Sequence, residues 1–267
     1  MTELNKLIKP ISDNHSIKEA VISLFLANPI IKPERFEDLI KNDFKEKFQK
    51  FEKASQIQFQ FKGNHSTIDN FQHQVSENIG FKFQKFEEGK IVRALQGMNE
   101  HSRNYISYHS FNYLTWDKFF YDFKEVITIL SNFHGELYVN AFSLHYIDEF
   151  EWTGESDIDV KKIFNENSTL LPNEFFICRL NNYQFTTIKK NEVEYFDRLE
   201  IKVDERPKKF ITISHNVVLN YNETMGLNDL INSSNLKEML DHAHLLNKNT
   251  LTNILTKEVC DLIKLII

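Results

Sequence analysis

The sequence is poor in cysteine and glycine, and both shortages exclude classes of function. Only two of its 267 residues are cysteine, Cys178 and Cys260, and no Cys-x-x-Cys pair is present. This excludes a disulfide-built fold and a thiolate zinc site, and it is typical of proteins of a reducing cytoplasm. The 7 glycines are scattered and form no Gly-x-x-x-x-Gly-Lys, Gly-x-Gly-x-x-Gly or Gly-x-Ser-x-Gly motif. A nucleotide-hydrolysing motor, a Rossmann enzyme and a serine hydrolase of the elbow type are therefore disfavoured.

The chain also lacks a long apolar run and an excess of basic residues. No stretch of 18 residues is apolar throughout, so we expect no membrane span, and Met1 to Lys6 begin no signal peptide. The formal net charge of −6 disfavours strong non-specific binding to nucleic acid. We therefore expect a cytoplasmic protein that holds no metal and no cofactor.

Phenylalanine is what the chain has in abundance. It supplies 24 residues, against 9 Tyr and 2 Trp. Because the Phe ring has no polar group, most of these rings must be buried, and a sizeable core follows.

The first half of the sequence predicts strands around one long helix. Residues 1–15 have no clear period and predict a loosely held arm, and residues 63–79 predict a loop or a short helix. Thr115 is a candidate N-cap for a helix over residues 116–133, in which we expect Trp116 to be a core anchor. The expected strands are 19–26, 56–62, 80–86, 91–96, 105–111 and 137–150, and Phe36, Ile40, Phe44, Phe48 and Phe51 predict an amphipathic helix from Pro33 onward.

The second half repeats the order of strands followed by helices. A polar segment, 153–173, separates the N-terminal half, 1–152, from the C-terminal half, 174–267. In that half we expect strands over 175–180, 183–189, 195–204 and 210–221, a helix around 236–246, and a last helix capped by Thr256. The sequence thus predicts an α+β fold of two mostly antiparallel sheet-plus-helix halves packed together, with a possible distant structural repeat.

One pattern resembles the site of a metal-dependent nuclease. Glu200 and Lys202 form a strand-borne Glu-x-Lys pair, which needs a second carboxylate from a neighbouring segment to hold Mg²⁺. Asp197 falls on the opposite face of the strand, so Asp157 or Asp159 would have to serve. The alternative is that Glu200 and Lys202 form the solvent face of a strand whose inner face is Leu199, Ile201 and Val203.

Two further clusters are candidates for binding. Lys189, Lys190, Arg206, Lys208 and Lys209 predict a small basic patch for nucleic acid, or else a solvated hairpin end. In Asp241-His242-Ala243-His244 the two imidazoles stand at i and i+2 on a helix, so they point apart and predict no shared metal ion. We expect His244 to be partly buried and His242 to face outward.

A set of short motifs gives the chain its one resemblance to a known family. They are Ser16–Val21, Gly80–Phe83, the Glu88-Gly89 turn, Tyr113–Phe119, Leu144–Phe150, and His244 with Leu251 and Leu255-Thr256. Together they resemble a family of prokaryotic proteins of about this length, sporadically distributed and of unknown function. His145 stands where that family has Arg and Asp148 where it has Asn, so any role of the Arg does not carry over.

The resemblance implies a function that the residues alone do not. A patchy distribution implies mobile genes, whose small products often belong to anti-phage defence or toxin–antitoxin pairs. Since no catalytic constellation stands out, we expect a non-enzymatic protein-binding or regulatory component of such a pair, with a protein partner encoded nearby. The alternative is a metal-dependent nuclease or nucleic-acid-binding effector that uses Glu200, Lys202 and Asp157.

Overall fold

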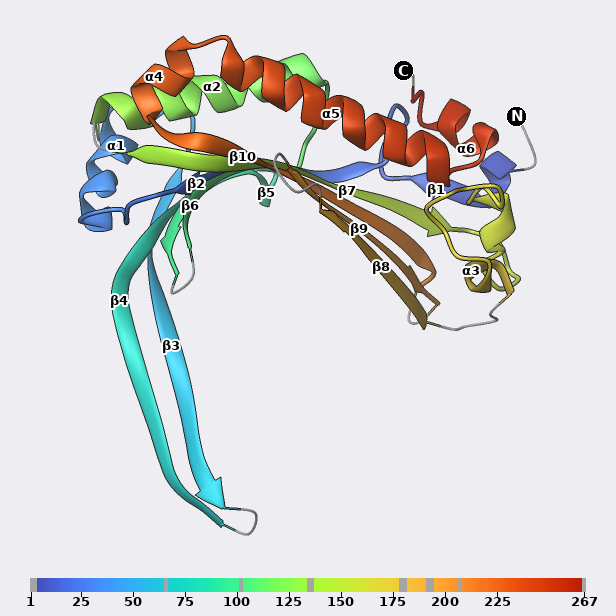
Figure 1. Ribbon diagram of the computed structural model, residues 1–267, viewed down its shortest axis with the longest axis horizontal. Helices are drawn as coiled ribbons and strands as arrows, with labels where there is room; N and C mark the ends of the chain where they lie inside the picture. The colour runs from blue at the N-terminus through green and yellow to red at the C-terminus, as the bar shows by residue number, and fades with distance from the viewer. Residues whose placement is uncertain are drawn as a thin grey trace.

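The computed structural model describes residues 4–64, 67–100, 103–133, 137–177, 182–190, 195–205 and 208–265. They form one antiparallel sheet with helices on one of its faces (Figure 1). The strands are β1 (Ile8–Pro10), β2 (Ile17–Leu26), β3 (Lys50–Asn64), β4 (Thr67–Glu87), β5 (Lys90–Asn99), β6 (Asn104–Ser110), β7 (Tyr138–Trp152), β8 (Asn182–Lys190), β9 (Tyr195–Asp204) and β10 (Phe210–Gly226). The helices are α1 (Glu37–Lys41), α2 (Trp116–Phe133), α3 (Glu174–Ile177), α4 (Leu227–Asn232), α5 (Asn235–Ile254) and α6 (Lys257–Leu262), with 3₁₀ turns at Leu4–Lys6, Pro33–Phe36 and Val160–Lys162.

The sheet runs without a break through both halves of the sequence. Its strand order is β3-β4-β5-β6-β2-β7-β10-β9-β8, and β1 pairs with the end of β7. Strand β2 therefore lies in the middle, between β6 and β7, and β7 joins it to β10 of the second half. The α+β class predicted from the sequence is confirmed.

One face of the sheet is covered by α2, α4 and α5 (Figure 1). Two hydrophobic clusters lie under these helices. The larger joins α2, α4 and the first half of α5 to β2, β6 and β7, and the smaller joins the end of α5 and α6 to β9 and β10. The strands β7 and β10 and the helix α5 contribute to both clusters. The boundary between the two clusters therefore does not coincide with the segment 153–173 that separates the two halves of the sequence. Among the described residues, no helix combines the length and apolarity needed to cross a membrane.

Local signals in the sequence place several elements correctly. Helix α2 begins at Trp116 as predicted, and the Thr115 hydroxyl accepts a hydrogen bond from the backbone N–H of Lys118 (3.3 Å). The β4–β5 hairpin turns at Glu88 and Gly89, whose φ angles of 50° and 76° are the left-handed values that a tight hairpin needs. Thr256 caps α6 by accepting from the backbone N–H of Val259 (3.4 Å).

The predicted helix from Pro33 onward is wrong in its length, although its phenylalanines are core residues as expected. A 3₁₀ turn and α1 cover only Pro33–Lys41, and turns follow until β3 begins at Lys50. Phe36, Phe44 and Phe48 are nevertheless buried, and they pack on the Phe81 and Phe83 rings of β4. A compact loop can direct rings inward at helix-like spacing, so the period alone did not identify a helix.

Three other predicted segments differ in the structure. Residues 4–15 of the predicted loose N-terminal segment are held in place, because β1 pairs with β7 and Ile8 is buried, and residues 1–3 lie outside the described residues. Residues 67–79, predicted as a loop or short helix, belong to β4, whose polar composition hid the strand. Residues 174–177 of the predicted strand 175–180 form the helix α3, and the rest of that strand lies outside the described residues.

Strands β3 and β4 extend together beyond the rest of the sheet. Strand β4 pairs with β5 only from Gly80 onward, whereas its pairing with β3 continues to the Asn64–Thr67 pair. Within the described residues, the stretch 56–76 therefore forms a two-stranded ribbon, which reaches away from the body in Figure 1. We call residues 56–64 of β3 and 67–76 of β4 the arm.

Candidate functional site

In the part of the chain that the structure describes, α2, α4 and α5 lie on one face of the sheet, and strand pairing aligns the side chains of the opposite face in rows (Figure 1). One row consists of serines: Ser23 of β2 pairs with Ser107 of β6 on one side and with Ser143 of β7 on the other. Because alternate residues share a face, Phe25 and Tyr105 stand in the row on one side of these serines, and His145 stands in the row on the other. Small residues flanked by larger ones leave a hollow in the sheet surface.

This hollow has a volume of about 320 Å³ and spans four strands. Its lining residues are Ser23, Phe25, Glu100, Arg103, Tyr105, Ser143, His145 and Asn216. We call it the serine pocket. Ser143, at the bottom of the hollow, is only 3% exposed.

The floor of the serine pocket is polar but uncharged. Burial lowers the pKa of the His145 imidazole below its ordinary value, and Nε2 of the ring lies 2.8 Å from Oγ of Ser214. The amide oxygen of Asn216 is enclosed and has no hydrogen-bond partner among the described residues. An enclosed acceptor without a donor is costly unless water or a ligand supplies one.

The rim of the pocket carries one charge of each sign. The Arg103 guanidinium lies over the ring of Phe25, 5.6 Å from its centroid. The Tyr105 hydroxyl donates to a carboxylate oxygen of Glu100 (3.2 Å). Burial raises the pKa of Tyr105 to about 12, so the hydroxyl keeps its proton at neutral pH.

Beside the pocket, three side chains have the connectivity of a nucleophile, a base and an orienting acid. Oγ of Ser107 lies 2.9 Å from Nε2 of His109, and Nδ1 of His109 lies 2.7 Å from Oε1 of Glu19. Ser107, however, is 2% exposed and sits mid-strand, where β5 and β2 use the backbone N–H groups on both sides. Without free N–H groups to stabilise an oxyanion, the trio is a hydrogen-bond network rather than a catalytic triad.

Comparison with known proteins does not assign this site. No family model matches the chain, and neither does any curated protein or solved structure. The resemblance to a sporadically distributed prokaryotic family therefore stays a prediction.

The Glu200 and Lys202 pair lies on the face of β9 opposite the helices, bound to neighbours on the same sheet. Glu200 accepts from Arg198 (2.6 Å) and from the Gln184 amide (3.0 Å), and Lys202 pairs with Asp204 (2.8 Å). Asp157 lies in the exposed segment before the Val160–Lys162 turn and is not among these partners. The inner face is as expected, since Leu199, Ile201 and Val203 are buried. Among the described residues, no three His, Cys, Asp or Glu side chains are placed to hold a metal ion.

Strand register separates the members of the predicted basic patch. Lys189 pairs with Asp197 at one end of β9, whereas β10 begins opposite Asp204 at the other end, about 20 Å away. Lys190 follows Lys189, and Lys208 precedes β10, so the two groups do not form one patch. Lys209 donates to the backbone carbonyls of residues 154, 155 and 156 (3.1, 3.0 and 2.8 Å), and Arg206 lies outside the described residues.

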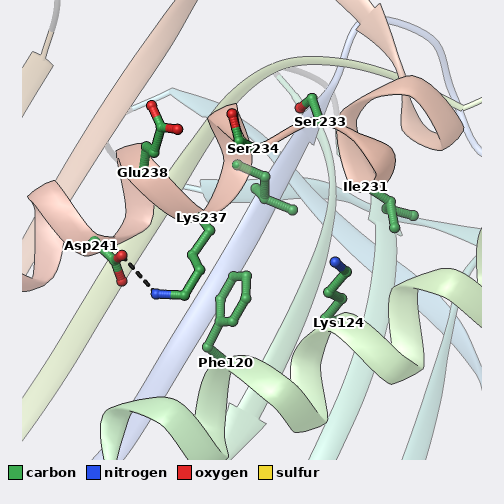
Figure 2. Close-up of a pocket in the computed structure, with 9 residues that line it drawn as sticks. Phe120, Lys124, Ile231, Ser233, Ser234, Lys237, Glu238 and Asp241 are labelled. Atoms are coloured by element: carbon green, nitrogen blue, oxygen red, sulfur yellow. Dashed lines mark hydrogen bonds and ion pairs between the residues drawn. The ribbon is translucent and has the colours of Figure 1, made fainter.

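On the covered side, the acid–imidazole cluster of α5 holds α2 in place. The His242 side chain is exposed and His244 is partly buried, as predicted. The Trp116 indole donates to Asp241 (2.7 Å), whose other oxygen accepts from Lys237 (2.7 Å). Figure 2 shows this end of α5 beside α2, where a cavity of about 250 Å³ lies between the Lys237 side chain, Phe120 and the start of α5.

A buried polar layer that the sequence did not reveal lies under α5, between the two hydrophobic clusters. The Asn247 amide donates to Nδ1 of the fully buried His215 (3.0 Å), whose Nε2 donates to Asp197 (2.9 Å). Asp148, 1% exposed, accepts from the Ser16 hydroxyl (2.6 Å), while its second oxygen has no partner among the described residues. Burial raises the pKa of Asp148 to about 6. The sequence signal for this buried polar layer was Asp148, a charged residue at an inward position of β7.

Proposed function

We propose that this chain is a non-enzymatic protein-binding component and that the arm, residues 56–64 of β3 and 67–76 of β4, binds the partner. The observation that carries the proposal is the pairing of the arm, whose strands pair only with each other among the described residues. The β3–β4 pairing is long, because it continues well beyond Gly80–Met98, the last pair that β4 makes with β5.

The register of the arm supports this role. Ile57 pairs with Val75, Phe59 with His73, and Phe61 with Phe71. Since alternate residues of a strand share a face, these three pairs belong to one face of the ribbon, and all six residues except His73 are apolar. The other face carries Gln58 and Gln60, paired with Gln74 and Gln72.

The physical argument is one of stability. A two-stranded ribbon alone is at best marginally stable in water, because it buries little apolar surface. A partner protein that covers the face with Phe59 and Phe61 would bury that surface and order the ribbon. The proposed occupant is therefore an apolar groove or sheet face on a different protein.

The biological setting of the partner follows from the resemblance stated above. We propose that the partner is the product of a neighbouring gene, in an anti-phage defence or toxin–antitoxin pair. The nuclease alternative has less support, because Glu200 and Lys202 are engaged by neighbours on the sheet and Asp157 is not among them.

Two matched variants test the proposal. The first replaces Phe59 and Phe61 by Ser, and the second replaces Gln58 and Gln60 by Ser on the opposite face of the same strand. Each is co-expressed with the products of the genes on either side and analysed by size-exclusion chromatography. We expect the natural chain and the glutamine variant to elute with a partner, and the phenylalanine variant to elute alone.

Circular dichroism of each variant supplies the folding control. If the phenylalanine variant still elutes with the partner, the arm does not bind it. Self-association of the natural chain that the phenylalanine changes abolish would identify a second copy, not a different protein, as the occupant.

A further inference from the structure

We propose that the serine pocket binds a neutral, hydroxyl-rich small molecule of the sugar class. The inference is independent of the proposed function, because the pocket lies on the body of the sheet and shares no residue with the arm.

The shape of the pocket is a consequence of strand register. The serines of β2, β6 and β7 lie side by side, and each is two residues from a taller side chain on its own strand. The resulting hollow of about 320 Å³ is at the lower end of the range for small-molecule sites. It suits one or two saturated rings better than an extended chain.

The charge of the pocket excludes ionic ligands. Its floor consists of the hydroxyls of Ser23 and Ser143, the amide of Asn216, and the imidazole of His145, whose pKa burial keeps below its ordinary value. Among the described lining residues, the charged side chains are Arg103 and Glu100, one of each sign, and both stand at the rim. Phosphate and carboxylate ligands are usually held by several cations or backbone N–H groups, which this floor does not offer.

The hydrogen-bonding pattern selects hydroxyl groups. The enclosed Asn216 oxygen has no donor among the described residues, the amide N–H₂ of Asn216 donates, and the serine hydroxyls can both donate and accept. A sugar hydroxyl can donate one hydrogen bond and accept another, so it can pair with either the donors or the acceptors of this floor. The Tyr105 ring supplies an apolar wall for the C–H face of a sugar ring, whereas the Phe25 ring lies under the Arg103 guanidinium.

The experiment is a binding titration on the full chain. The probes are glucose, galactose, mannose, N-acetylglucosamine and ribose. Their binding is monitored by ligand-observed saturation-transfer NMR, which detects weak binding. Inorganic phosphate and adenine are titrated in parallel to represent anionic and flat aromatic ligands. We expect saturable binding of at least one sugar, and none of phosphate or adenine.

Variants locate the binding. Ser143→Val fills the floor and removes a hydroxyl, and Ser23→Val does the same from the neighbouring strand, which keeps the test valid if one of them fails to fold. Thr212→Val is the matched control, on the same face of β10 but outside the pocket. We expect at least about tenfold weaker binding for either serine variant and a change below about twofold for the control.

Three results would overturn the proposal. They are the absence of binding for every sugar, binding of phosphate or adenine in place of sugars, and sugar binding that both serine variants retain.

Discussion

The Trp116 indole lies flat against the His244 imidazole, with ring centroids 4.7 Å apart and planes 10° from parallel. This stack joins the first turn of α2 to the middle of α5. In the sequence, the strands β7, β8, β9 and β10 lie between these two helices. Nδ1 of the same imidazole lies 3.0 Å from the hydroxyl of Tyr146, a fully buried residue of β7. The His244 ring therefore connects both long helices to β7.

Removing the indole should destabilise the fold. Trp116→Ala loses the stack on His244, the packing against Phe119 and Phe120 and the bond to Asp241, so we expect a loss of about 3 kcal/mol in the free energy of unfolding. Urea denaturation measures it. Tyr121→Ala, on the exposed side of α2, is the control and should cost below about 1 kcal/mol. Equal denaturation midpoints for natural chain and Trp116→Ala would show that the indole is no anchor.

The same stack should make the fold sensitive to acid. Burial lowers the pKa of His244 to about 4, from an ordinary value of 6.5, so the native state resists a proton that the unfolded chain accepts. Stability is therefore fully present above pH 6.5 and is lost as the pH falls toward 4, by about 1–3 kcal/mol once partial exposure is allowed for. His244→Asn should flatten this slope in denaturation curves measured between pH 7 and 4. An unchanged slope would assign the acid sensitivity to another group.

Asp148 should act in the opposite sense. Because burial raises its pKa from 3.8 to about 6, the native state favours the protonated acid, and stability falls as the pH rises from 4 through 6. The penalty at pH 7 is about 3 kcal/mol at most, from two pH units at about 1.4 kcal/mol each. Asp148→Asn keeps an acceptor for Ser16 and carries no charge, so we expect a higher melting temperature at pH 7.5 and little change at pH 4. A lower melting temperature at both pH values would contradict this account.

The strand-borne Glu200 and Lys202 distinguish the two functional hypotheses. If they only cover the surface of β9, Glu200→Ala and Lys202→Ala should each change stability by about 0.5 kcal/mol or less and leave partner binding intact. Cleavage of single- and double-stranded DNA with Mg²⁺, assayed beside melting curves, is the measurement. Cleavage by the natural chain that both variants lose, with unchanged melting, would favour the nuclease over the binding protein.

What the sequence predicted well depended on neighbours along the chain. The cap at Thr115, the Glu88-Gly89 turn and the alternation in β9 are local patterns, and each is present in the structure. The Phe-rich segment after Pro33 shows the limit, because rings can reach a core from a loop as well as from a helix. The polar half of β4 has only Phe71 and Val75 as alternating apolar residues, too few to reveal a strand, whereas its partner in β3 alternates over 56–62 and was predicted.

The candidate pocket could not be predicted because it depends on register between distant strands. Alternation shows that Ser23, Ser107 and Ser143 each lie on a given face, but not that they lie side by side. The pairing of β2 with both β6 and β7 creates the hollow, and the sequence contains no signal for that pairing. The same holds for His215 and Asn247, whose contact joins a strand to a helix.

The central place of β2 also has a consequence for synthesis of the chain. Its inward residues Ala20, Ile22, Leu24 and Leu26 are made early, but β7, which pairs with one of its edges, ends at Trp152, more than a hundred residues later. At the usual pace of a ribosome, about 5–20 residues per second, this apolar strand waits roughly 6–25 s for its neighbour. Throughout that interval one edge of β2 has unpaired backbone N–H and C=O groups, so we expect this strand to be prone to aggregation and to bind a chaperone.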